Sequence, residues 1–119
     1  MTETQSKKVY DLGERTKRFA RRVREYVQSL PKSLANMEDG RQVIRSSGSV
    51  GANYIEADES LSKKDFMLRM KICRKEAKES KYWLELIDVK QDMFKEKEAL
   101  IQEAGELTKI FGAIVQRSK

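Results

Sequence analysis

Hydrophobic residues recur at three- and four-residue steps in four stretches of the chain, which is the spacing of one face of an α-helix. We expect helices at about residues 7–30, 36–60, 63–88 and 95–117. Pro31 ends the first helix, and Ser62 followed by Asp65 resembles a capping box at the start of the third. No stretch alternates apolar and polar residues as a strand does. The pattern predicts one domain over residues 1–119, an all-α antiparallel up-and-down four-helix bundle.

The second helix contains a stretch with few charges, Gln42–Ala57, in which Arg45 and Glu56 are the charged residues although 37% of the chain is charged. Such a segment is expected to be enclosed by the other helices. Glycine inside a helix costs about 1 kcal/mol relative to alanine, so we expect a neighbour to pack closely onto Gly48 and Gly51. A stripe of mostly short polar side chains, suited to hydrogen bonding, runs beside the apolar face: Ser46, Ser49, Asn53, Glu56 and Ser60.

Two further expectations concern these small and polar positions. Glu56 is expected to accept hydrogen bonds or to pair with a cation across the bundle. The fourth helix repeats the small-residue face with Gly105 and Gly112, and two such faces exceed the needs of one core, which predicts self-association. The segment SSGSVGAN lacks both the GxxxxGK[ST] pattern and a preceding strand, so a phosphate-binding loop is disfavoured.

Composition argues against most catalytic chemistry. The chain has no histidine and one cysteine, Cys73, which falls on the apolar line of the third helix and is interpreted as a core residue. Asn53 and Glu56 lie one turn apart, but a lone carboxylate makes a poor acid–base site. We expect no catalytic residue, no metal and no cofactor. Without a membrane-length apolar run or a signal-peptide core in MTETQSKK, the expected location is cytoplasmic, with no membrane partner.

The net charge of +6 is unevenly spread, with +5 in residues 1–35, −3 in 36–61, +4 in 62–90 and none in 91–119. The positive charge lies mainly on the first and third helices. A planar arginine guanidinium can bind two phosphate oxygens at once, so the basic faces of these helices predict nucleic-acid binding; the alternative is an ordinary solvated surface. Trp83 either packs at the bundle rim or forms a subunit contact. The candidate phosphate ligands are Arg15, Lys17, Arg18, Arg21, Arg22 and Arg24 on the first helix, and Lys71, Arg74, Lys75 and Lys78 on the third.

Four segments carry a family resemblance: LPK, SxxSVxANYIEA, KKDFxxRMKIxRKEAxExxYWLELI and EAxELTKIFxAIV. From about Val9 to Val115 the chain resembles the bacterial four-helix bundle proteins encoded by intervening sequences of 23S ribosomal RNA genes. The resemblance implies a cytoplasmic homopentameric ring with a basic surface and no established catalytic activity. A related branch, the accessory variability determinant proteins of retroelements, contacts a reverse transcriptase and nucleic acid. Positions matching the family's second-helix signature, which the resemblance makes fold and assembly positions, are Ser46, Ser49, Asn53, Glu56 and Ala57, the last often glycine.

Two functions from different classes follow. The first is an oligomeric protein that binds RNA or DNA phosphates; in a fivefold ring the +6 of each chain becomes +30, a field that favours any polyanion without reading its sequence. The second is a structural or adaptor module whose ring docks a protein such as a reverse transcriptase. The sequence shows no basic patch interleaved with exposed aromatic residues, so base stacking is not signalled. It also leaves open whether the two basic faces form one groove.

Overall fold

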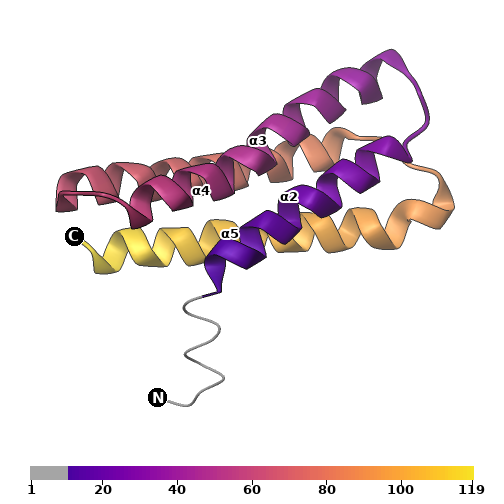
Figure 1. Ribbon diagram of the computed structural model, residues 1–119. Coiled ribbons are helices and arrows are strands. Elements are labelled where there is room, and N and C mark those ends of the chain that lie inside the picture. The colour runs from indigo at the N-terminus through magenta and orange to yellow at the C-terminus, as the bar shows by residue number, and fades with distance from the viewer. Residues whose placement is uncertain (1–10) are drawn as a thin grey trace.

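The computed structural model describes residues 11–119, which fold into four long helices with no strand among them (Figure 1). The helices are α2 (Leu12–Gln28), α3 (Leu34–Asp58), α4 (Lys63–Leu86) and α5 (Phe94–Arg117), and a short 3₁₀ helix, η1 (Gln91–Met93), precedes α5. Predicted helical residues 7–10 lie outside the described range. The all-α prediction is confirmed.

Each helix packs against the next one in the chain, and a thinner contact between α2 and α5 closes the ring. The α2–α3 and α4–α5 connections lie at one end of the bundle, and the α3–α4 connection lies at the other, near the C-terminus (Figure 1). This arrangement is the predicted up-and-down bundle. It makes α2 and α4 diagonal neighbours without direct packing between them.

The predicted apolar lines meet in one core. Its largest fully buried side chains include Phe19 and Tyr26 from α2 and Phe111 from α5. Burying a side chain of this size stabilises the fold by about 1.5–3 kcal/mol. Leu61 is 100% exposed, because α3 ends at Asp58 and leaves Leu61 in the turn before α4.

The helix ends differ from the predicted ones by one or two residues at most positions where the structure describes them. Ser33 caps α3, because its hydroxyl accepts the Asn36 backbone N–H at 3.0 Å. Ser62 caps α4 by accepting the Asp65 N–H at 3.1 Å, as expected. The start of α3 therefore lies two residues before the predicted one.

The side chain of Asn36 ties two connections together. It is 4% exposed, and its Nδ2 donates to the carbonyl oxygens of Pro31 at 3.1 Å and Asp88 at 2.9 Å. Its Oδ1 accepts the Asp88 N–H at 3.1 Å. The amide thus satisfies backbone groups that helix termini leave without partners.

Candidate nucleic-acid interface

The short polar stripe of α3 bonds to α4 and within α3. The hydroxyls of Ser46 and Ser80 lie 2.8 Å apart in the core, and Arg69 Nη1 donates to Asn53 Oδ1 at 3.0 Å. Asn53 Nδ2 in turn donates to the carbonyl oxygen of Ser49 at 2.9 Å and to its hydroxyl at 3.0 Å. Three of the predicted packing positions, Ser46, Ser49 and Asn53, therefore make hydrogen bonds within a single chain.

Glu56 does not make the expected cross-bundle ion pair. Its side chain is exposed, and its carboxylate lies within ion-pair distance of no cation in residues 11–119. Glu56 lies in the last turn of α3, which ends at Asp58. Within the described chain it is a surface carboxylate.

The two glycines of α3 face α2. A Cβ atom built on Gly51 would lie 3.1 Å from Thr16 Oγ1, so this position has little space for a side chain. At Gly48 the nearest atom is the flexible end of Arg24, at 3.4 Å. Close packing is confirmed, most strictly at Gly51. Because α2 of the same chain makes these contacts, these two glycines do not require a second copy.

Arg45 is the hub of an ion-pair network between α3 and α4. Its Nη1 lies 3.0 Å from Glu76 Oε2, and its Nη2 contacts Glu79 Oε1. Trp83 Nε1 donates to the same Glu79 oxygen at 3.1 Å. Trp83 is half-buried against the core, which matches the predicted rim position, whereas its role in a subunit contact stays a prediction.

Two of the six candidate cations of α2 are used inside the molecule. Arg15 donates to both carboxylate oxygens of Glu103, at 2.7 and 2.8 Å, and to Glu106 at 3.1 Å. The bonds to Glu103 are the main reason that the pKa of Arg15 is raised above its ordinary value. Arg22 pairs with Glu96 at 2.9 Å. These pairs join α2 to α5 along what we call the α2–α5 seam.

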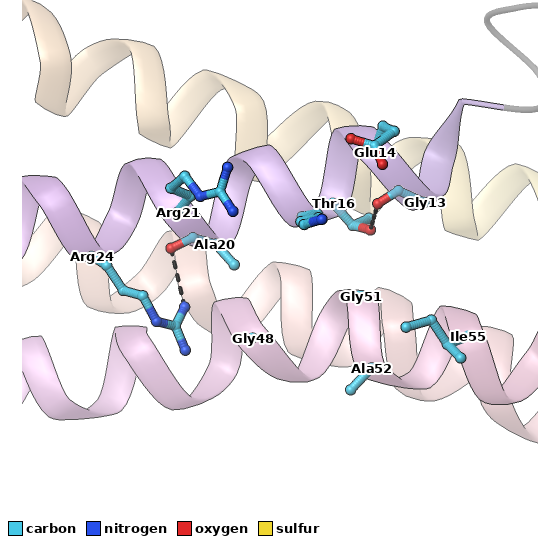
Figure 2. Close-up of a pocket in the computed structure, with 11 residues that line it drawn as sticks. Gly13, Glu14, Thr16, Ala20, Arg21, Arg24, Gly48, Gly51, Ala52 and Ile55 are labelled. Atoms are coloured by element: carbon cyan, nitrogen blue, oxygen red, sulfur yellow. Dashed lines mark hydrogen bonds between the residues drawn. The ribbon is translucent and has the colours of Figure 1, made fainter.

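None of the remaining cations of α2 has a carboxylate within 4.0 Å among the described residues, and three of the four lie on the side of the helix that faces α3. Lys17, Arg21 and Arg24 line a groove of about 640 Å³ between α2 and α3, whose opposite wall contains Gly48, Ala52 and Ile55. In Figure 2, Arg24 reaches across this groove while donating to the Ala20 carbonyl, at 3.1 Å. Arg18 is exposed beside the α2–α5 seam and lines a separate hollow.

The basic residues of α4 line a second groove, between α4 and α5, of about 1010 Å³. Arg74, Lys78 and Lys81 come from α4, and Lys109 comes from α5. The glycines of α5 give them room: the Arg74 side chain passes 3.5 Å from a Cβ position on Gly112, and Lys81 Nζ lies 3.9 Å from one on Gly105. We call this the α4–α5 groove.

The structure resolves how the two basic faces are related. Because α2 and α4 are diagonal, their cations form two separate surfaces rather than one groove. Lys75 lies in a hollow adjoining the α4–α5 groove, and Lys71 lies farther along α4. Lys109 and Tyr82 also line this groove, and no sequence pattern predicted it, since only the packing of α5 onto α4 brings them into one groove with Arg74 and Lys78.

The one cysteine is placed for packing rather than reaction. Cys73 is fully buried, its thiol donates to the Val50 carbonyl at 3.4 Å, and burial raises its pKa to about 12. A protonated buried thiol is a poor nucleophile. In residues 11–119 no three potential ligands among Cys, Asp and Glu are grouped for a metal ion. Likewise, no helix in that range is long and apolar enough to cross a membrane.

Comparison with known proteins agrees with this architecture. A search of curated proteins found no match. The chain is similar to the crystal structure of a protein of unknown function from the S23 ribosomal protein family of Bacteroides thetaiotaomicron VPI-5482, with 27% identity and a TM-score of 0.71 over 87% of this chain and 96% of the other. The family model described as 23S rRNA-intervening sequence protein matches residues 8–113. With nearly its whole length matched, the chain belongs to the 23S rRNA-intervening sequence protein family.

Proposed function

We propose that this chain is a non-enzymatic protein that binds the phosphates of RNA or DNA through the basic surfaces of α2 and α4. The observation that carries the proposal is the division of the cations. Among the candidate ligands, Arg15 and Arg22 are paired with carboxylates, as is Arg45 on α3, whereas the other candidates have no ion-pair partner among residues 11–119. Those candidates are Lys17, Arg18, Arg21 and Arg24 on α2 and Lys71, Arg74, Lys75 and Lys78 on α4.

Unpaired cations on a rigid helix suit sequence-independent binding. A phosphate backbone releases counterions when such groups neutralise it, and this release drives affinity without base readout. The proposed active form is a cytoplasmic homopentamer, in which every copy repeats both surfaces. Repetition would raise affinity for a long strand by multivalency.

The test is a titration of labelled structured RNA, single-stranded RNA and duplex DNA at two salt concentrations. Three double variants are compared: Arg18→Glu/Arg21→Glu on α2, Arg74→Glu/Lys78→Glu on α4, and Lys32→Glu/Lys90→Glu in the two connections at one end of the bundle. Each lowers the net charge from +6 to +2, so total charge is matched and position alone differs.

We expect wild type and the connection variant to bind with a steep salt dependence, and the helix variants to bind more weakly. The slope of log K against log salt should fall by about 0.7 to 0.9 for each lost phosphate contact. Equal loss in all three variants would show that net charge, not these surfaces, drives binding. No binding by wild type at low salt would refute the proposed function.

The second candidate function is protein docking, including docking of a reverse transcriptase, and it has its own observation. Several large apolar side chains near the two ends of the bundle are more than half exposed, including Leu34, Met37, Ile55, Leu61 and Leu68. Exposed apolar groups of this kind often mark association surfaces. Replacing Leu61 and Leu68 with serine should then change the mass measured by light scattering while leaving helicity intact; an unchanged mass would remove these two residues from the interface.

A further inference from the structure

Resting on the proposed function, we infer that the α4–α5 groove binds a single-stranded nucleic acid, with the Tyr82 ring as a platform on which one base stacks. A Tyr82 side chain that is 55% exposed lines this groove together with Arg74 and Lys78. The same three residues also line the adjoining hollow that contains Lys75. Tyr82 therefore stands between two concave basic surfaces.

The orientation of Tyr82 is fixed by its neighbour. Its ring meets the Trp83 ring edge to face, with centroids 5.0 Å apart and an interplanar angle of 71°. Trp83 is itself anchored by its hydrogen bond to Glu79, which Arg45 holds in turn. An aromatic ring that is already immobilised loses little side-chain entropy when a base stacks on it.

The cations around Tyr82 are arranged along the groove. Arg74, Lys78 and Lys81 succeed one another at steps of one helical turn, so they recur about every 5.4 Å along α4. Lys109 faces them from α5. This row can contact successive phosphates of a strand that runs parallel to α4.

The acidic residues of the groove do not cancel this field. Glu85 and Glu106 line it against four cations. Glu106 is already engaged, since it pairs with Arg15 at 3.1 Å and accepts from Gln102 at 3.2 Å. The residues that line the groove therefore carry a net positive charge.

A single strand fits these features better than a duplex does. Sequence-tolerant recognition of single strands combines a basic groove with aromatic stacking, because unpaired bases expose their faces. In a duplex the base faces are occupied by stacking on one another, so Tyr82 would have nothing to contact. By contrast, no aromatic side chain from residues 11–119 lines the α2–α3 groove, so those residues make it a site for phosphates alone.

The experiment measures binding of an oligothymidylate of about 20 nucleotides, an abasic strand of the same backbone and length, and the corresponding duplex. Tyr82→Ala is compared with Tyr82→Phe, which keeps the ring. Phe94→Ala is the matched control, since Phe94 is 54% exposed but does not line the groove. Circular dichroism verifies that each variant is folded.

We expect Tyr82→Ala to raise the Kd for the intact single strand about tenfold, and Tyr82→Phe and Phe94→Ala to change it by less than about twofold. On the abasic strand the Tyr82→Ala effect should vanish. Fluorescence of the single tryptophan, Trp83, should change on binding of the intact strand, since it touches Tyr82.

The outcomes separate the two proposals. If wild type binds all three ligands and Tyr82→Ala binds the intact strand as wild type does, the stacking site is refuted while phosphate binding stands. An equal loss on the intact and abasic strands would also overturn stacking. If wild type binds none of the ligands at low salt, both proposals fail.

Discussion

Replacing Arg45 with methionine would leave the carboxylate of Glu76 without its cation in a buried position. The side chain of Glu76 is 6% exposed, whereas that of Arg45 is 51% exposed. The perturbation is therefore asymmetric. Water can solvate a lone arginine here, but it cannot reach a lone glutamate nearly as well.

The expected loss of stability lies between two limits. Breaking a fully buried pair by removing one partner costs about 3–5 kcal/mol, and an exposed pair contributes about 0.2–1 kcal/mol. With one buried and one half-exposed partner, we expect Arg45→Met to lower the free energy of unfolding by about 2 kcal/mol. For a chain of this size that corresponds to a drop of about 8 °C in Tm.

The assay is urea unfolding at pH 7, at fixed protein concentration, followed by far-UV circular dichroism and by Trp83 fluorescence. Arg45→Met is compared with Glu76→Gln and with the double variant Arg45→Met/Glu76→Gln. If the cost comes from an unpaired buried charge, the double variant must be more stable than Arg45→Met. A single variant within about 0.5 kcal/mol of wild type, or a double variant no better than the single, would refute the reasoning.

Three other predictions follow from the core and the connections. Asn36→Ala should lower the free energy of unfolding by about 3 kcal/mol in thermal or urea unfolding, because it leaves buried backbone groups without partners; a loss below 1 kcal/mol would contradict it. Gly51→Val should cost about 2 kcal/mol through its clash with Thr16, whereas Gly48→Ala should be neutral or stabilising; equal melting temperatures for the two would be inconsistent with the packing described. Stability should also fall as pH rises from about 9 to 12, because burial raises the pKa of Cys73 from 9.0 to about 12 and that of Tyr26 from 10.0 to about 12. Both groups stay protonated in the folded chain while they ionise in the unfolded chain. Between its unfolded and folded pKa, each therefore lowers the free energy of unfolding by up to about 1.4 kcal/mol per pH unit. The stability of Cys73→Ala should decline less steeply with pH, and an unchanged alkaline slope in that variant would count against the argument.

Apolar periodicity was enough to predict the helices, their order and most of the core. Residues such as Phe19, Val43, Cys73 and Phe111 are buried because their spacing puts them on one face of each helix. A short-range pattern also identified Ser62 as a cap. These features depend on residues that are close together in the sequence, so they can be predicted without knowing which helices are neighbours.

Ion-pair partners could not be predicted from the sequence in the same way. Arg15 and Arg18 look equivalent in sequence, yet one is paired with Glu103, 88 positions away, and the other is exposed without an ion-pair partner among the described residues. The separation of the basic faces and the place of Tyr82 beside them likewise depend on which helices are adjacent. Such facts come from three-dimensional packing, in which a residue's role is set by positions far along the chain.

The thin α2–α5 seam has a consequence for how the molecule opens. The contact of α2 with α5 is small and includes the ion pairs of Arg15 and Arg22, which salt screens, whereas α4 packs extensively against both α3 and α5. Subglobal opening should therefore begin with the release of α2 from α5, with the remaining three helices as the more persistent cooperative unit. Amide hydrogen exchange would then show α2 exchanging before α4, and faster at higher salt. Separation of α2 from α3 as well would uncover the glycine-bearing face of α3, so loss of the α2–α5 contact is the first step toward making that face available to a second chain.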